Sequence, residues 1–156
     1  MQLFQLQLKL ITFLVFSVST GILYSQNKTI TGRVIAEDLE TVPFASIMIN
    51  DAVQVGRTDL NGFFQIDIPV SEKKILFMFA GMESTTIELA DTCDEVELVM
   101  MFSRIYDFKT LKKVDRLRKK RIKKLPALHK QAFEKGLFKT DKACYTQKFI
   151  SYYKKK

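Results

Sequence analysis

The sequence is poor in the residues that build most catalytic and metal centres. Its 156 residues include one His, two Cys and no Trp. A zinc site usually has four protein ligands, or three and a water, so Asp and Glu would have to supply most of its shell here. This composition disfavours a histidine-based metal centre. The chain length favours a single domain with appendages over a large catalytic architecture.

The motifs of common hydrolytic and phosphate-binding sites are also missing. The sequence contains no Gly-x-Ser-x-Gly elbow and no Gly-rich phosphate loop. A Ser-His-Asp or Cys-His site would have to use His129, and nothing in the sequence orients it toward Cys144. We therefore interpret His129 as a solvated helix residue, and we predict no catalytic residue, no cofactor and no metal site.

Acidic residues are scarce in the last third of the chain. Residues 103–156 carry 19 Lys+Arg against 4 Asp+Glu, a net charge of +15, whereas residues 1–102 carry 6 against 13, a net charge of −7. This change predicts a domain at residues 26–102 followed by a basic extension at residues 103–156. The two opposite charges should attract each other within the chain.

The first 25 residues have the pattern of a secretory signal. Lys9 precedes an apolar run at residues 10–18, small residues follow, and Ser25 suits the position before a cleavage site. An uncleaved anchor is the alternative, but a spanning helix needs about 20 apolar residues and Ser17 and Ser19 interrupt this stretch. We predict a signal peptide at residues 1–25 and a protein exported to the periplasm or the outer membrane, where a disulfide can persist.

Residues 26–102 show the alternation and turn spacing of a β-sandwich. The run at residues 75–80 is apolar on both faces, as expected for a central strand, and Glu88, Glu95 and Glu97 share a face that we interpret as solvated. Seven short strands without a helical period predict a mainly β fold. The predicted strands are residues 29–35, 44–49, 54–58, 63–68, 75–80, 85–89 and 95–100.

Four blocks in this region, at residues 30–34, 42–47, 56–66 and 76–84, occur in a familiar order. The most specific is Thr-Asp-x-x-Gly-x-Phe at residues 58–64, with Pro-x-Ala upstream at residues 43–45. The region resembles the carboxypeptidase-regulatory-like domain of exported Bacteroidetes proteins, which also stands at the front of TonB-dependent receptors. The resemblance implies a seven-stranded transthyretin-like sandwich in the cell envelope. Met82 departs from the family, which usually has an aromatic residue there.

The Thr-Asp block also suggests a turn. Asp59, Asn61 and Gly62 lie between two predicted strands, where Asp and Asn side chains accept hydrogen bonds from turn amides and Gly adopts positive φ. We interpret them as a structural turn. The alternative is a calcium loop that includes Asp67, but Ser71 stands where the bidentate acidic ligand of such a loop belongs.

The two cysteines, Cys93 and Cys144, allow one intramolecular disulfide. In an oxidising compartment this bond would close a loop of about 50 residues and stabilise the fold by ~4 kcal/mol in the chain-entropy model. The alternative is two unpaired thiols. The spacing alone leaves the choice open.

The basic extension begins with an amphipathic pattern that predicts a helix at residues 105–125. Leu111, Val114, Ile122 and Leu125 form a narrow stripe flanked by Phe108 and Leu117, and Pro126 breaks or restarts the helix before a second one at residues 127–135. We leave the structure of residues 137–156 open. The candidates for anion contact are Lys119, Lys120, Arg121, Lys123 and Lys124.

These observations favour a non-catalytic exported module of the cell envelope, with a β-sandwich scaffold and a cationic tail that contacts an envelope protein, a glycan or an anionic membrane surface. A second hypothesis is a polyanion-binding protein acting through the tail with its aromatic residues as stacking or insertion groups, although export disfavours nucleic acid as the natural ligand. An enzyme is the third hypothesis and is disfavoured. The plainest alternative for the charge run is a solvated helix face.

Overall fold

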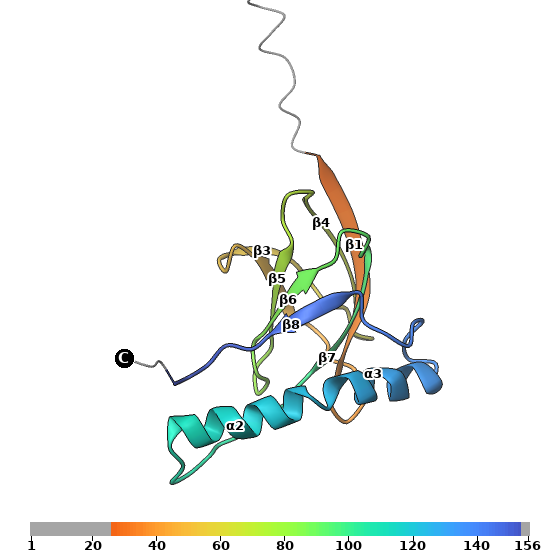
Figure 1. Ribbon diagram of the computed structural model, residues 1–156. Coiled ribbons are helices and arrows are strands. Elements are labelled where there is room, and N and C mark those ends of the chain that lie inside the picture. The colour runs from red at the N-terminus through yellow and green to blue at the C-terminus, as the bar shows by residue number, and fades with distance from the viewer. Residues whose placement is uncertain (1–25, 154–156) are drawn as a thin grey trace, which may run out of the picture.

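The computed structural model describes residues 26–153, which fold into two β-sheets with a helical layer beside them (Figure 1). The strands of the three-stranded sheet are, in order, β4 (Phe63–Pro69), β1 (Asn27–Ala36) and β7 (Glu95–Met100). Those of the five-stranded sheet are β3 (Val53–Arg57), β2 (Ser46–Ile49), β5 (Lys74–Met78), β6 (Thr85–Leu89) and β8 (Tyr145–Lys148). Strand β1 pairs antiparallel with β4 and parallel with β7.

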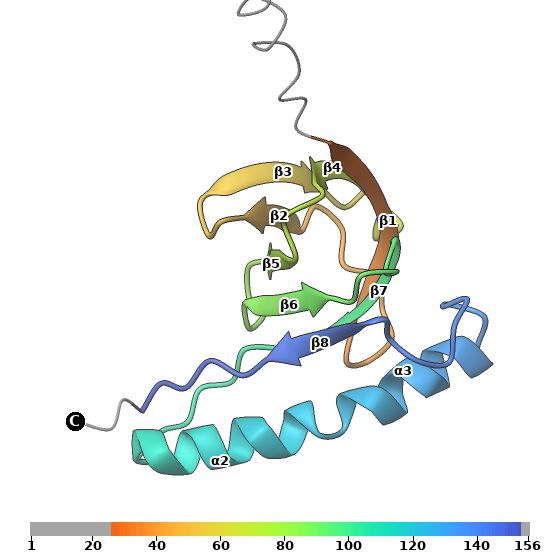
Figure 2. The ribbon, with the colours of Figure 1, turned by 45° about the horizontal axis from the view of Figure 1, so that its top comes forward.

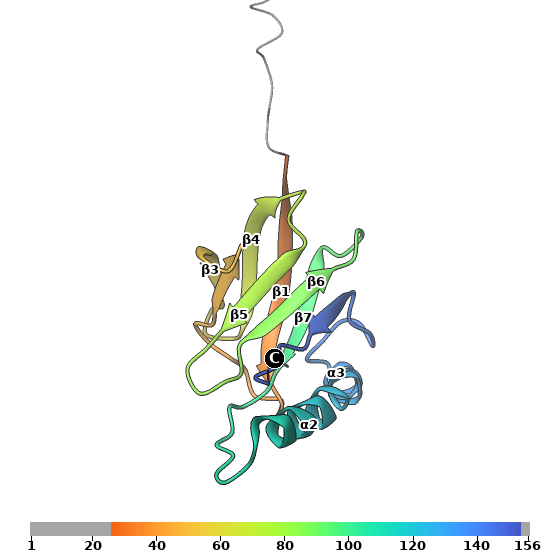
Figure 3. The same ribbon diagram turned by 60° about the vertical axis from the view of Figure 1, so that its left-hand side comes forward.

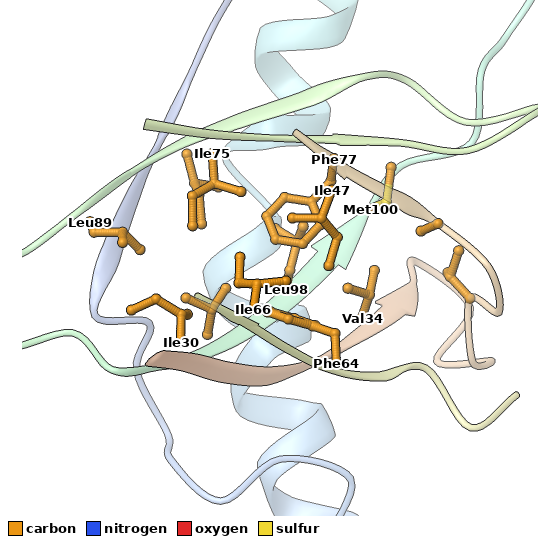
Figure 4. Packing of buried hydrophobic residues seen from close by; sticks show 14 of the residues in the cluster. Ile30, Val34, Ile47, Phe64, Ile66, Ile75, Phe77, Leu89, Leu98 and Met100 are labelled. Atoms are coloured by element: carbon orange, nitrogen blue, oxygen red, sulfur yellow. The ribbon is translucent and has the colours of Figure 1, made fainter. Parts of the chain in front are cut away.

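The main core lies between the two sheets. Alternate residues of β1, such as Ile30 and Val34, point inward and meet Leu98 of the neighbouring β7 and Phe77 of the opposite sheet (Figure 4). The rings of Phe64 and Phe77 pack edge to face with centroids 5.5 Å apart. The cluster contains mainly apolar side chains from the predicted strands, so the pleated alternation read from the sequence builds this core.

Two helices, α2 (Leu111–Ile122) and α3 (Leu125–Glu134), follow one another along one side of the sandwich (Figures 2 and 3). Ile35 and Val99 face away from the main core and pack with Leu125, Ala132 and Phe138. This second, smaller core fixes α3 against the outer face of β1 and β7.

The mainly β fold is confirmed, and each of the seven predicted strands overlaps an observed one. The predicted number of strands was one too low, because β8 from the basic extension pairs antiparallel with β6 and becomes an eighth strand. The extension is thus part of the sandwich. Its strand gains its backbone partners from a segment more than 50 residues earlier in the chain.

The prediction of one helix at residues 105–125 was wrong in extent. Helix α2 begins at Leu111, after Thr110 accepts a hydrogen bond from the Lys113 amide, and α3 restarts at Leu125 with Pro126 in its first turn. Val114 and Leu125 of the predicted stripe are buried, whereas Leu111 and Phe108 are exposed. The predicted signal peptide lies outside the described residues, and no helix within residues 26–153 is long and apolar enough to cross a membrane.

Candidate functional site: a cationic helix face anchored by buried arginines

Helix α2 attaches to the sandwich mainly through charged groups. The Arg118 Nε atom donates to Glu83 at 2.9 Å, and its guanidinium also donates to Asp115 at 3.3 Å and to the Ile150 carbonyl at 2.8 Å. The side chains of Arg118 and Glu83 are 6% and 5% exposed. A buried charge needs such partners, since an unpaired one is costly. The inward face of α2 is therefore an ion-pair anchor.

Arg121 extends this anchor. Its guanidinium donates to Glu83 at 3.0 Å, to Glu37 at 2.9 Å and to the Phe102 carbonyl at 2.7 Å. Burial opposes its charge, but the hydrogen bonds to Tyr106 and Glu37 raise the pKa of Arg121. Arg121 was a predicted anion contact, and that prediction was wrong because its side chain is already bound within the fold.

The end of the described chain closes over the same anchor. Asp115 accepts hydrogen bonds from the Ser151 hydroxyl and from the amides of Tyr152 and Tyr153, and the Tyr152 ring centroid lies 3.8 Å from the Arg118 guanidinium carbon. Desolvation opposes the ionisation of Asp115, but these hydrogen bonds and Arg118 outweigh it and lower the pKa of Asp115 to about 2. The carboxylate therefore stays charged near neutral pH.

The opposite face of α2 and the turn after it carry cations outside the ion-pair anchor, of which Lys119 lies with its ammonium group 4.8 Å from the Phe149 ring centroid. At 100° per residue, seven Lys and Arg side chains fall within an arc of about 140°. All seven are exposed, and none forms an ion pair with another described residue. We name this set the cationic face: Lys112, Lys113, Arg116, Lys119, Lys120, Lys123 and Lys124. Four of the five predicted anion contacts belong to it.

A loop with exposed apolar side chains precedes the cationic face. Ile105 is 89% exposed, Phe108 is fully exposed, and Leu111 at the start of α2 is also exposed. The loop projects beyond the first turn of α2, away from the sheets (Figures 1 and 3). We name Ile105, Phe108 and Leu111 the apolar tip. Sequence reasoning assigned Phe108 to the flank of a buried stripe, which the structure contradicts.

Two acids of the predicted polar face pair with lysines of the extension. Glu88 lies 2.7 Å from the Lys148 ammonium group, and Glu95 pairs with Lys139. Hydrogen bonding with Lys148 lowers the pKa of Glu88. The opposite charges of the two regions thus meet within the chain, as the charge distribution predicted.

Two further predictions were wrong: Glu97 and His129 were expected to be solvated, and both are buried. The Glu97 carboxylate accepts hydrogen bonds from the Thr140 amide and hydroxyl and from the Lys139 amide. The His129 Nε2 atom lies 3.9 Å from Glu97 and has no hydrogen-bond partner among the described residues. Desolvation lowers the pKa of His129, although Glu97 opposes this effect. Glu97 thus fastens the loop after α3 to β7.

The structure contains the predicted turn and a disulfide between the two cysteines. Asp59 accepts hydrogen bonds from the Asn61 and Phe63 amides, both at 2.8 Å, and Gly62 has φ +79°. Cys93 and Cys144 are joined by a disulfide, with Cα atoms 5.4 Å apart, directly before β8. Within residues 26–153, no group of three His, Cys, Asp or Glu side chains is placed to hold a metal ion.

A groove of about 600 Å³ separates β8 from the helices. Apolar side chains of Val99, Ile122, Leu125 and Pro126 line one part of it, and residues 145–147 of β8 line another. This volume falls within the range of small-molecule and cofactor sites.

The sequence matches no family model and no curated protein. Among solved structures, the C-terminal domain of the PapC usher matches 49% of this chain and all of that domain, with 14% identity and a TM-score of 0.36. A second structure of that domain matches 51% of this chain and 95% of that one, with 16% identity and a TM-score of 0.33. An E. coli P pilus tip assembly intermediate matches 55% of this chain and 11% of that chain, with 12% identity and a TM-score of 0.40.

Proposed function

We propose that the protein is a non-catalytic exported module of the cell envelope that docks on an anionic membrane surface through the cationic face of α2. The observation that carries the proposal is the sorting of charge around this helix. Arg118 and Arg121 point inward and bind carboxylates of the fold, whereas the seven cations of the cationic face point outward without ion-pair partners. The fold therefore holds the helix in place and leaves one charged side for contact.

The electrostatic strength of this contact follows from the number of cations. Each Lys or Arg close to an anionic leaflet adds ~1 kcal/mol, and the effect falls off within a Debye length of ~8 Å at physiological salt. Removing three cations should weaken binding roughly 100-fold at low salt. The binding should also decrease steeply as salt is added.

The apolar tip supports a membrane rather than a soluble polyanion as the partner. Peripheral proteins combine a cationic surface with exposed large apolar residues that enter the interface between headgroups and acyl chains. Ile105 and Phe108 are nearly fully exposed beside the first turn of α2. Burying such side chains adds ~1.5–3 kcal/mol each, which salt does not screen.

The transthyretin-like assignment of residues 27–100 is part of this proposal. It is supported by the Thr-Asp-x-x-Gly-x-Phe block, in which Asp59 caps the turn between β3 and β4. Export is supported by the pattern of residues 1–25 and by the disulfide. In this role the sandwich is a rigid support and the helix is the contact surface.

Co-sedimentation of residues 26–156 with vesicles tests the proposal. We expect binding to vesicles with 30% anionic phospholipid, little binding to purely zwitterionic vesicles, and a steep loss with added salt. Replacing Lys120, Lys123 and Lys124 with Gln should weaken binding. The matched control removes the same charge from the sandwich.

The control variant carries Lys28→Gln, Arg57→Gln and Lys74→Gln and should bind nearly as well as the unaltered protein. Equal losses in both variants would mean that net charge alone drives binding and would contradict a specific face. Equal competition by single-stranded DNA and by anionic vesicles would favour the polyanion hypothesis instead.

A further inference from the structure

Strand β8 has an open edge. It is the last strand of the five-stranded sheet and pairs only with β6, with Tyr145 opposite Leu89 and Gln147 opposite Ile87. The Ala90 amide donates to the Cys144 carbonyl at 3.1 Å, in the same register. Antiparallel ladders alternate between hydrogen-bonded and open pairs, so Thr146 and Lys148 direct their backbone groups toward β6.

The backbone groups of Tyr145 and Gln147 therefore point away from β6. Among residues 26–153, no backbone hydrogen bond joins these two residues to any segment outside β6. Exposed edges of this kind are templates for a further strand, and proteins usually blunt or cover them. Here the helices do not seal the edge, because the groove of about 600 Å³ lies between them and β8.

The groove suits the side chains of an added strand. Figure 2 shows β8 running alongside the region where α2 passes into α3. Ile122, Leu125 and Pro126 from the helices and Val99 from β7 line the groove with apolar surface. In an added strand, every second side chain would point toward these residues.

The mouth of the groove carries positive charge. Lys130 and Lys142 belong to its lining, and the Lys130 ammonium group also lies 3.8 Å from the Glu134 carboxylate. Asp141 is the one acid in the lining. Two lysines against one acid in the lining favour a segment with acidic side chains over a basic one.

We propose that this groove takes an extended segment of a partner protein, with acidic and apolar residues in alternation, which pairs with the open edge of β8. Its backbone would exchange hydrogen bonds with Tyr145 and Gln147, its apolar side chains would enter the groove, and its carboxylates would meet the lysines. This strand-addition mode derives affinity from the main chain and specificity from the pockets for alternate side chains. The site is distinct from the membrane-contacting role of the apolar tip.

The test uses a fluorescein-labelled peptide of ten residues that alternates valine with glutamate, titrated with residues 26–156 and followed by fluorescence anisotropy. The decisive variant is Gln147→Pro, which removes one outward N–H and is tolerated at an edge strand. We expect it to weaken binding at least tenfold. The matched Gln147→Ala variant keeps the N–H, and its affinity should stay within about twofold.

A second variant keeps the proposal testable if Gln147→Pro impairs folding. Lys130→Glu together with Lys142→Glu leaves the backbone intact and should weaken the binding of the valine–glutamate peptide at least tenfold. A peptide that alternates valine with lysine should bind the double variant more tightly than the unaltered protein. Amide hydrogen exchange at Gln147 should slow when the valine–glutamate peptide binds.

Three results would overturn the proposal. One is the absence of binding by the valine–glutamate peptide at millimolar protein. Another is equal affinity of Gln147→Pro and Gln147→Ala in folded protein. The third is displacement of the peptide by a short fatty acid without any change in exchange at Gln147, which would make the groove a small-molecule site.

Discussion

The buried arginine of α2 offers a sharp test of how the basic extension is held. Arg118 makes hydrogen bonds to Glu83, Asp115 and the Ile150 carbonyl, and both carboxylates are buried. Replacing Arg118 with Met keeps an unbranched apolar stem and removes the charged guanidinium. Asp115 then loses its cationic partner inside the fold, whereas Glu83 keeps the Arg121 guanidinium at 3.0 Å.

The expected cost follows from this burial. Removing one partner of a buried ion pair costs ~3–5 kcal/mol, because the remaining charge stays desolvated. For a chain of this length, 1 kcal/mol corresponds to roughly 3–5 °C in Tm, so the variant should melt roughly 10–20 °C lower. Because Arg118 and Glu83 are in direct contact, the effects of Arg118→Met and Glu83→Gln should not be additive.

Thermal and urea unfolding followed by circular dichroism measure this effect at pH 7. The matched control is Arg116→Met, which removes the same charge two residues earlier on the exposed face. We expect it to change stability by less than ~0.5 kcal/mol. If Arg118→Met costs no more than Arg116→Met, the inward ion pairs do not anchor α2.

Three further outcomes are expected. The pKa of His129 is lowered from its usual 6.5 mainly by desolvation, against the opposing carboxylates of Glu97 and Asp141. Its contribution to stability should be complete above about pH 6.5 and decrease below it, so urea unfolding at pH 7.5 and 5.0 should show a larger loss for the unaltered protein than for His129→Gln. Replacing Cys93 and Cys144 with Ala should lower the unfolding free energy by ~4 kcal/mol, and an unchanged urea midpoint would refute this. Residues 26–101 retain nearly all of the main core, so they should still melt cooperatively, at lower temperature than residues 26–156; a non-cooperative melt would show that β8 and the helices are needed for folding.

The seven strands of residues 27–100 could be predicted because their signal is local. Alternation in β1 and the continuous apolar run of β5 follow directly from which face each residue presents to the core. Strand β8, with the sequence Tyr-Thr-Gln-Lys, has no such signal. It is a strand because β6 supplies backbone partners and the disulfide at Cys144 holds its start.

The helix layer shows where periodicity misleads. A stripe of apolar residues predicted the inward face of α2, but Asp115, Arg118 and Arg121 also point inward. Their partners Glu83 and Glu37 lie in loops far away in the sequence, so the pairing could not be read from the helix itself. The exposed cations could be predicted, because free charges need no partner to remain at the surface.

Glu97 and His129 were misassigned for the same reason. Strand alternation placed Glu97 on an outward face, which is correct, but α3 and the loop after it cover that face. Once covered, the carboxylate is satisfied by the Thr140 and Lys139 amides. Only the long-range contact between α3 and β7 explains its burial.

The central claim is that α2 and the apolar tip contact an anionic membrane. The chain contains no Trp, so Phe108→Trp introduces a single indole at the apolar tip and Leu60→Trp introduces one at an exposed turn of the sandwich. On mixing with vesicles that contain 30% anionic phospholipid, the Phe108→Trp emission should shift to the blue and be quenched by brominated acyl chains, while the Leu60→Trp emission stays unchanged. No shift for Phe108→Trp, or equal shifts for both variants, would contradict docking through this face.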